Sequence, residues 1–409
     1  MKQNSRASAL KAFKGLAVLM SAAMILAACA PAATPVPTAV PTTVPPTAAP
    51  AATTAPAATE APTAAAAGGM DALIAAAKAE GQLTVIALPH DWCNYGGMID
   101  GFKAKYGLTV NEITPDAGSG DEVNAIKANQ SNAGPQAPDV IDVGLSFGPQ
   151  AKTDKLIQPY KVSTWADIPD SAKDADGYWY GDYYGVMAFM VNTDVQPKVP
   201  ADWSDLLAAD YKGQIALSGD PRVSNQAIQA VVAAGLANGG TPDNPQAGLD
   251  FFAKLNKAGN LVPVIANNAL VSKGEVAVRL TWDYNALAGR DGFKGNPKVQ
   301  VVVPKTGRIG GIYVQAISAY APHLNAAKLW MEYLYSDAGQ LIWLAPPGYC
   351  HPIRQDAMDK ANKIPAALKA QLPDVSGAVF PSLDAQNASA KLITGNWDKV
   401  VGADVKKAP

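Results

Sequence analysis

The stretch WYGDYYGVMAFMVN at residues 179–192 decides the fold. It is rich in aromatic and β-branched residues and has no turn signal after Gly185, so it predicts one long strand rather than a hairpin. Such a strand is longer than the usual length of about five or six residues, and it can pass between two separate lobes. A second extended aromatic run, IYVQAISAY at residues 312–320, predicts that the chain crosses between the lobes twice.

Strands and helices alternate on both sides of the first crossing strand. Strands are expected at residues 83–88, 108–113, 139–143, 213–217, 276–281 and 299–303. Helices are expected at residues 70–80, 98–106, 123–128, 225–237, 248–258 and 325–335. The alternation predicts two α/β lobes, each with a mostly parallel sheet covered by helices. Helices from residue 356 onward are expected to close the body.

The first 28 residues have the pattern of a secretory signal. Four cations and no acid precede a 14-residue apolar run at residues 15–28, which is too short to span a bilayer. The run ends in Leu26-Ala27-Ala28-Cys29, which resembles the lipobox of bacterial lipoproteins. That resemblance implies cleavage before Cys29, lipidation of Cys29 and a tether to the outer face of a membrane. A plain signal peptide and an uncleaved anchor are the alternatives.

Residues 29–69 are expected to form a linker. Beyond Cys29 they are almost entirely Ala, Pro, Thr and Val, with one charge (Glu60) and no aromatic residue, so they cannot build a core. The sequence leaves open whether this linker is glycosylated. The expected organisation is a signal (1–28), a linker (29–69), a first lobe (70–185 with 316–355), a second lobe (186–315) and closing helices (356–409).

The charge balance argues against nucleic acid as a partner. The chain has 33 Lys and Arg against 35 Asp and Glu, and removing the four cations of the signal leaves 29 against 35. An acidic chain without basic clusters binds nucleic acid poorly. No later apolar run approaches the length of a membrane span, so the lipid is the only membrane attachment expected.

Several short motifs resemble one known family. They are APDVIDV (137–143), YGV (184–186) with VNTD (191–194), WSDLL (203–207), DYKGQIAL (210–217), AAKLWMEYL (326–334) and SDAGQ (336–340). In this order they resemble the extracellular solute-binding proteins of ABC importers, and most closely the iron, polyamine and aminophosphonate branch. The resemblance implies a type II periplasmic-binding-protein fold with a ligand cleft at the hinge. It also implies a monomer that lies outside the cytoplasm and has no cofactor or enzymatic activity. Such a protein delivers its solute to an ABC permease, which works with an ATPase.

Loops that follow strands are the first place to look for ligand groups, because ligands of open α/β sheets lie beyond the carboxyl ends of the strands. His90, Trp92 and Tyr95 follow the first strand, either lining a cleft or packing between lobes. Asp283 lies between Trp282 and Tyr284 after a later strand. This carboxylate could hold a cation with help from the rings, or could be a structural helix cap beside core rings.

A third loop offers groups for an anion. Ser224 precedes the helix expected at 225–237, with Arg222 and Asn225 beside it, and could either cap that helix or expose its N–H groups to an anion. Further candidates are Tyr313, Gln315 and Ser146. Together these residues predict a small amine or zwitterion as ligand. Its amine would lie among Trp92, Trp282 and Tyr284 against Asp283, and any acid group would lie at Ser224 and Asn225.

Two other functions have partial matches in the sequence. His90 and Tyr284 fall where ferric-binding relatives have two of their ligands, but Gly144 and Asn285 stand where the other two would be, which leaves too few for iron. GLSFG at 144–148 matches the G-x-S-x-G motif of serine hydrolases, with Ser146 as nucleophile and Asp283 and His351 following in the right order. That motif needs a helix directly after the serine, whereas Gly148-Pro149 is expected to interrupt one. A lipid-anchored adhesin is a further alternative.

Cys93 and Cys350 remain once Cys29 is lipidated. Outside the cytoplasm two thiols in one chain are more often paired than free. In the resembled fold both segments belong to the first lobe near the cleft, which makes a disulfide plausible and would hold Trp92 and Tyr95 in place. Two reduced thiols, or a metal or redox role with His90 and His351, are the alternatives.

Overall fold

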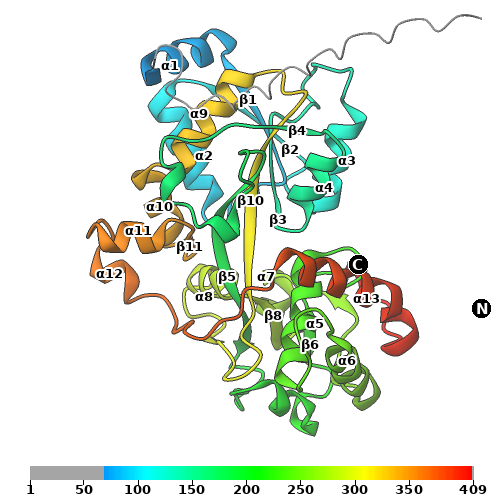
Figure 1. The fold of residues 1–409 in the computed structure, drawn as a ribbon. Helices are drawn as coiled ribbons and strands as arrows, with labels where there is room; N and C mark the ends of the chain where they lie inside the picture. The colour runs from blue at the N-terminus through cyan, green and yellow to red at the C-terminus, as the bar shows by residue number, and fades with distance from the viewer. Residues whose placement is uncertain (1–68, 408–409) are drawn as a thin grey trace, which may run out of the picture. The chain divides into compact units, whose positions relative to one another are not determined.

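The computed structural model describes residues 69–407. The expected signal, the lipidated Cys29 and nearly all of the linker lie outside these residues. Figure 1 shows two α/β lobes within the described body, joined by long strands. No helix between residues 69 and 407 has the length and apolar character needed to cross a membrane.

The first lobe is built from both ends of the body. Its elements before the crossing are α1 (Gly69–Glu80), β1 (Gln82–Ile86), α2 (Tyr95–Tyr106), β2 (Thr109–Ile113), α3 (Ser119–Ala128), β3 (Val140–Gly144), α4 (Phe147–Thr153) and β4 (Ile157–Gln158). Its later elements are β10 (Gly310–Ser318), α9 (Leu324–Leu334), α10 (Asp337–Leu344) and β11 (His351–Pro352). The two sets are joined closely, since α1 packs on α9 and Glu80 accepts hydrogen bonds from the backbone N–H groups of Asn325 and Ala326.

The second lobe contains the middle of the chain. Its elements are β6 (Ile215–Leu217), α5 (Asn225–Ala237), α6 (Gln246–Ala258), β7 (Val264–Ile265), α7 (Asn268–Lys273), β8 (Val278–Trp282), α8 (Asp283–Gly292) and β9 (Val299–Val302). Helix α5 is buried over most of its length because the sheet lies on one side and α6 on another. Gly248 permits this close packing, since a Cβ there would overlap the carbonyl oxygen of Val231.

Strand β5 (Tyr180–Asn192) belongs to the sheets of both lobes. From Tyr180 to Val186 it pairs with β10, and from Met187 to Asn192 with β8 and β9. Its 13 residues are buried except for the half-buried Tyr184. The aromatic and aliphatic run in the sequence therefore corresponds to a strand covered on both faces across the hinge, which confirms the α/β two-lobe fold class.

Strand direction differs from the expectation. Strands β1 and β2, and β6 and β8, are parallel, but β10 is antiparallel to β3 and β5, and β5 is antiparallel to β8 and β9. The reason is that a chain passing out of one lobe and back again enters each sheet in opposite directions. The mostly parallel sheets expected from the alternation of elements are therefore mixed.

The chain also crosses the hinge a third time, where the sequence predicted two crossings. The second crossing runs through residues 303–309, and β10 itself lies wholly in the sheet of the first lobe, although the predicted boundary fell at residue 315. Helices α11 (Gln355–Lys360) and α12 (Ala366–Lys369) then pack near α10. Beyond them Val379 pairs with the backbone beside Ile309, and α13 (Leu383–Val400) packs on α5 and α6 of the second lobe.

The C-terminal segment is fixed by specific contacts. The ring centroids of Trp397 on α13 and Phe252 on α6 are 5.7 Å apart, and Asn256 donates to the carbonyl of Val401. The last strand, β12 (Lys406–Lys407), pairs with β7. The closing helices therefore divide between the lobes, because the apolar face of α13 meets α6 while α11 and α12 cover α10.

Candidate functional site

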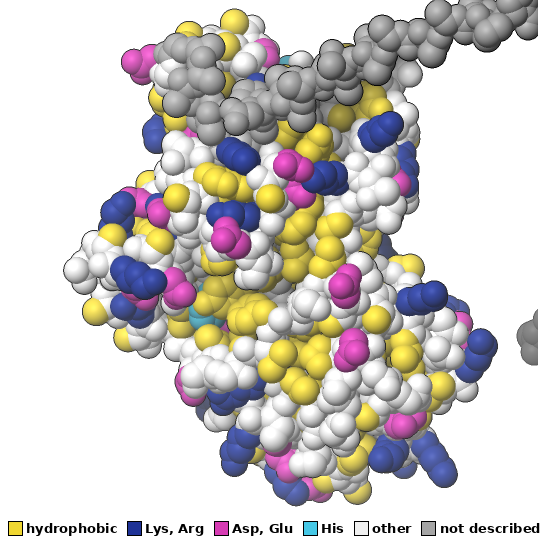
Figure 2. All heavy atoms as spheres, viewed as in Figure 1, with side chains coloured by type: hydrophobic (Ala, Val, Ile, Leu, Met, Phe, Trp, Pro, Cys, Tyr) yellow, Lys and Arg dark blue, Asp and Glu magenta, His cyan; other side chains and the backbone are white. Residues whose placement is uncertain are grey.

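Four aromatic side chains meet where the lobes touch. Trp92 lies in the loop between β1 and α2, Tyr183 on β5, Tyr313 on β10 and Tyr284 at the start of α8. The centroid of Trp92 is 5.5 Å from those of both Tyr284 and Tyr313, with edge-on geometry. Tyr183 stacks on Tyr313 at 5.5 Å and meets Tyr284 edge-on at 6.0 Å. We call these four rings the ring cage. Figure 2 shows that apolar side chains gather on the visible surface between the lobes.

Asp142 on β3 lies against the ring cage. Its Oδ2 accepts hydrogen bonds from the hydroxyls of Tyr183 (2.7 Å) and Tyr95 (2.8 Å), and Tyr183 in turn accepts one from Trp92 Nε1 (2.7 Å). Its Oδ1 has no hydrogen-bond partner among the described residues, although the residue is only 6% exposed. A buried carboxylate oxygen without a partner is costly, so the site is suited to a ligand that brings a donor or a positive charge.

A second acid, Asp182 on β5, lies behind Asp142. Gln315 donates one amide N–H to Asp182 Oδ2 (3.0 Å) and lies 2.8 Å from the Tyr95 hydroxyl, which is also 3.4 Å from Asp182. The antiparallel register explains this cluster, because Gln315 on β10 is directly opposite Asp142 on β3, and Tyr313 is opposite Gly144. Alternate residues of paired strands thus present one polar face beneath the rings.

Burial governs the protonation of these acids. Desolvation raises the pKa of Asp142 to about 7, and it raises the pKa of Asp182 well above its ordinary value with a further contribution from the charge of Asp142. Burial likewise raises the pKa of Glu122 on α3, whose carboxylate accepts the backbone N–H of Asp142. The charge of Asp142 is also among the causes that raise the pKa of Tyr284, after burial and the nearby Tyr313.

Two of the predicted site residues point away from the ring cage. His90 contacts Glu112 of β2 at 2.6 Å and its side chain is 61% exposed. Arg222 bonds Asp220 within its own loop and Asp404 near the C-terminus, so its charge is already paired. Both side chains are therefore engaged in local contacts in this structure.

Both carboxylate oxygens of Asp283 already have partners within the protein. Its Oδ1 accepts the backbone N–H groups of Val186 (2.9 Å) and Tyr284 (3.0 Å), and its Oδ2 lies 3.2 Å from His351 Nε2. Trp282 is fully buried and stacks with Tyr284 at 6.5 Å. Asp283 thus ties the start of α8 to β5 and β11, whereas the carboxylate with a free oxygen beside the rings is Asp142.

The start of α5 faces the first lobe. A Cβ on Gly144 would lie 2.7 Å from the side-chain nitrogen of Asn225, and Asn225 also lies beside the hydroxyl of Tyr313. Ser224 is the N-cap of α5 but its side chain makes no capping bond. Asn225 is therefore brought to the ring cage together with Tyr313, and Ser224 lies next to it.

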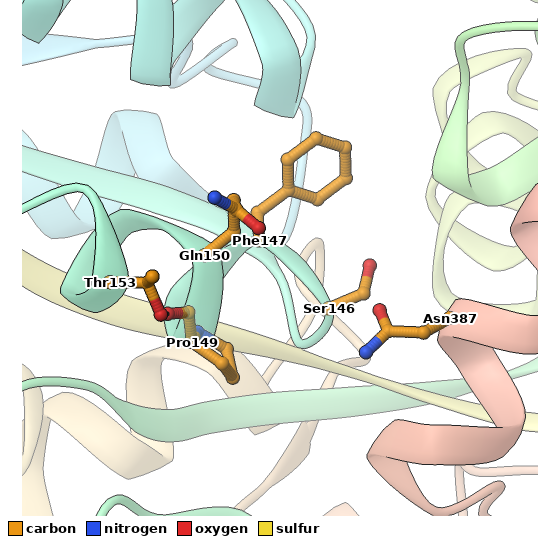
Figure 3. Close-up of a pocket in the computed structure, with 6 residues that line it drawn as sticks. All are labelled: Ser146, Phe147, Pro149, Gln150, Thr153 and Asn387. Atoms are coloured by element: carbon orange, nitrogen blue, oxygen red, sulfur yellow. The ribbon is translucent and has the colours of Figure 1, made fainter.

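Ser146 borders a groove of about 420 Å³ between the lobes. Figure 3 shows its hydroxyl and the amide of Asn387, from α13, directed toward one another across this groove. Contrary to the expectation that Pro149 interrupts a helix here, α4 begins directly after Ser146, since proline is tolerated in a first helical turn. His351 Nε2 contacts Asp283, as a triad would require, but His351 Nδ1 has no hydrogen-bond partner among the described residues. No serine hydroxyl therefore completes a hydrolase triad in this part of the chain.

Cys93 and Cys350 form a disulfide, with 5.5 Å between their Cα atoms, which confirms the predicted pairing. The bond joins the loop that carries Trp92 to the segment that carries His351. Between residues 69 and 407 no three His, Cys, Asp or Glu side chains are placed to hold a metal ion together. The iron alternative gains no geometric support from the described residues.

Sequence reasoning missed Asp142, Asp182, Tyr183 and Asn387. A signal for the two acids was available, because each interrupts an apolar or aromatic strand, VIDVG at 140–144 and YGDYY at 180–184. A charged residue in a strand buried on both faces is unusual unless it is paired or functional. Asn387 had no such signal, since its place depends on the third crossing.

Comparisons with known proteins agree on one family. Residues 136–376, more than half of the chain, match the family of bacterial extracellular solute-binding proteins. The chain is similar to a probable ABC transporter periplasmic-binding protein of Sinorhizobium fredii, with 26% identity over 286 residues that cover 66% of this chain and 75% of the relative. It is also similar to the spermidine/putrescine-binding periplasmic protein of Escherichia coli, with 31% identity over 159 residues that cover 37% of this chain and 42% of that protein.

Solved structures share the fold at low identity. The periplasmic binding protein P5PA matches with a TM-score of 0.62 and 23% identity, over 78% of this chain and 99% of its own. AfuA of Actinobacillus pleuropneumoniae, solved with fructose-6-phosphate, matches with a TM-score of 0.62 and 22% identity, over 79% and 99%. Iron-bound HitA of Pseudomonas aeruginosa matches with a TM-score of 0.59 and 18% identity, over 77% and 99%.

Proposed function

Because the chain belongs to the family of bacterial extracellular solute-binding proteins and is a receptor that delivers a solute to an ABC permease, we propose that its solute is a small organic amine or an amine-bearing zwitterion. The family places the protein outside the cytoplasm. We further propose that it acts as a monomer with a permease and an ATPase, tethered by a lipid on Cys29.

One observation carries the amine assignment, namely the unpartnered Oδ1 of buried Asp142 beside four aromatic rings. An ammonium group would donate to this oxygen and neutralise the carboxylate, which removes the cost of burying it alone. The faces of tryptophan and tyrosine attract a cation further, by about 0.5–2 kcal/mol for each favourable contact. A neutral sugar would gain neither the charge pairing nor the full ring attraction.

A zwitterion would find a second set of groups across the cleft. Asn225 and Ser224 lie at the start of α5, opposite Gly144 of the first lobe. The free N–H groups of a helix start favour a carboxylate or phosphonate. An acid group at this end and an amine at Asp142 would engage both lobes at once.

Engagement of both lobes supplies the mechanism of capture. Asp142 and Trp92 belong to the first lobe, while Tyr284 and Asn225 belong to the second. A ligand that touches all four gains its full binding energy only when the lobes are closed, and so shifts the population toward the closed form. The relative that is named for spermidine and putrescine supports an amine as the solute class.

Calorimetric titration with putrescine, spermidine, 2-aminoethylphosphonate, glucose and fructose-6-phosphate tests the proposal. We expect an amine to bind and Asp142→Asn to weaken it at least about 30-fold, the equivalent of about 2 kcal/mol for a buried charge partner. Asp100→Asn is the matched control, because the side chain of Asp100 on α2 is 74% exposed. Tight binding of a neutral sugar alone, or an amine affinity unaffected by Asp142→Asn, would refute the amine assignment.

A further inference from the structure

Asp142 and Asp182 form an acid pair that no cation between residues 69 and 407 neutralises. The Tyr95 hydroxyl lies 2.8 Å from Asp142 and 3.4 Å from Asp182, so the two carboxyl groups share one neighbour. The donors that reach the side chains of the pair are the hydroxyls of Tyr95 and Tyr183, the Gln315 amide and the backbone N–H of Tyr183. All of these donors are neutral.

The described residues around the pair likewise bring no positive charge to it. The titratable groups that face it from the packed elements are Tyr95 on α2, Glu122 on α3, Tyr183 on β5, Tyr284 on α8, Tyr313 on β10 and Tyr335 after α9. Each of these groups is either neutral or acidic. Within the described body, therefore, two ionised carboxylates at this place would be buried side by side without compensation, which is costly enough to retain a proton instead.

We propose that the Asp142–Asp182 pair holds a proton in the ligand-free receptor and releases it when a cationic amine enters the ring cage. This inference rests on the proposed amine ligand. The exchange balances charge: the ammonium group brings one positive charge to Asp142, the proton leaves to solvent, and the buried site keeps the same net charge. No bond of the ligand changes.

The pKa of Asp142, raised by burial to about 7, sets the range in which the exchange matters. Below that value the free receptor holds the proton on Asp142, and an ammonium neighbour favours the ionised form, so binding releases a proton. Affinity therefore rises with pH, by at most about tenfold per pH unit for one proton, and levels off above about 7. Burial and the charge of Asp142 raise the pKa of Asp182 well above its ordinary value, so Asp182 keeps its own proton over this range. Its hydrogen bond to Asp142 lowers the pKa of Asp142, which makes Asp182 a positioning residue.

The test uses putrescine, whose alkylammonium groups titrate near the lysine value of about 10 and so stay charged throughout. Calorimetry at about pH 6 and about pH 8, each in two buffers with different heats of ionisation, counts the protons released on binding. We expect close to one proton per putrescine at the lower pH and few at the higher. Asp182→Asn should release the same proton on binding putrescine, because burial and not Asp182 raises the pKa of Asp142, while Asp100→Asn should behave as wild type. A loss of proton release in Asp182→Asn would show that Asp142 is not the group that gives up the proton.

Infrared spectroscopy of the wild-type protein gives a readout that needs no variant. The carbonyl stretch of a protonated carboxyl group should be present in the ligand-free receptor at neutral pH and should decrease on addition of putrescine. If putrescine binds with the same affinity at both pH values and releases no proton, the exchange is refuted while the amine function stands. If no amine binds at either pH, the proposed function fails, and a missing carbonyl band in the free protein would then refute the stored proton separately.

Discussion

Gly185, in the middle of β5, leaves room for a ring of the cage. A Cβ at this position would overlap the ring of Tyr284 and lie 2.9 Å from Asp283 Oδ1. We expect Gly185→Ala to displace Tyr284 from Trp92, to lower putrescine affinity, and to cost about 1–3 kcal/mol of stability by overpacking. Calorimetry and urea denaturation measure the two effects. Gly120→Ala is the control, since the nearest atom there is 3.9 Å away, and equal behaviour of both variants would contradict the expected clash.

Asp142 should also make the stability of the ligand-free protein depend on pH. Its pKa is about 7 in the folded protein, whereas the pKa of an aspartate in an unfolded chain is about 4. Between these values the folded state binds more protons, so stability is greatest at the acid end and falls as pH rises through about 7. Urea denaturation over this range should show that the free energy of unfolding falls by a few kcal/mol at most, since each unit of pKa shift contributes about 1.4 kcal/mol. Asp142→Asn should reduce this fall. A slope that is the same in wild type and variant would exclude Asp142 as its source.

A direct comparison of two variants distinguishes the role of Asp283 from that of Asp142. The sequence predicted Asp283 as the partner of the amine, but its oxygens hold the backbone of Val186 and Tyr284 and face His351. We expect Asp283→Asn to lower stability and to weaken all ligands alike, whereas Asp142→Asn weakens amines selectively. Titration of both variants with putrescine and 2-aminoethylphosphonate checks this. A selective loss of amine binding in Asp283→Asn would return the role to that residue.

The residues of the site could be predicted only where the chain signals them locally. Trp92, Tyr284 and Tyr313 follow or lie on recognisable strands, so their grouping near a cleft followed from the sequence. The role of Asp142 did not, because it depends on the register that sets Gln315 opposite it and on which oxygen remains without a donor. Such facts arise from pairing between strands about 170 residues apart in the chain.

Among the elements, the loop between β1 and α2 depends on a covalent anchor. The Cys93–Cys350 disulfide fixes it to the segment that precedes β11. We expect Cys93→Ser with Cys350→Ser to lower stability by about 2–4 kcal/mol and to speed hydrogen exchange in residues 89–95, because Trp92 loses its support. Exchange mass spectrometry checks this. Reductant should mimic the double variant and leave that variant itself unchanged, and unaltered exchange in the loop would show that packing alone holds it.

The number of times the chain crosses between the lobes could be predicted only in part. A 13-residue buried strand has a clear signal in its aromatic run, and β5 was found from it. The third crossing has no comparable signal, because the segment around Val379 is short and its pairing is a single bridge to Ile309. The place of α13 on the second lobe follows from its contact with α6, which no local pattern encodes.

For the molecule as a whole, closure should be visible as a change in size. Small-angle scattering is expected to show a smaller radius of gyration with putrescine than without it, because the ligand favours the closed arrangement. Asp142→Asn at the same putrescine concentration should stay at the ligand-free value. An unchanged radius for wild type at saturating putrescine would mean that the lobes do not move on capture.

The close packing of α1 on α9, and of Cys93 with a partner 257 residues later, has a consequence for how the protein is made. A chain that emerges from its N-terminus delivers Trp92, Asp142 and Tyr183 early, but Tyr313 and the helix that supports α1 arrive only after β6 to β9 of the second lobe. The first lobe therefore begins first but is completed late, and only α13 and β12 of the second lobe follow it. Until export is nearly complete the binding site lacks one wall, and a prematurely terminated chain has no means of retaining solute.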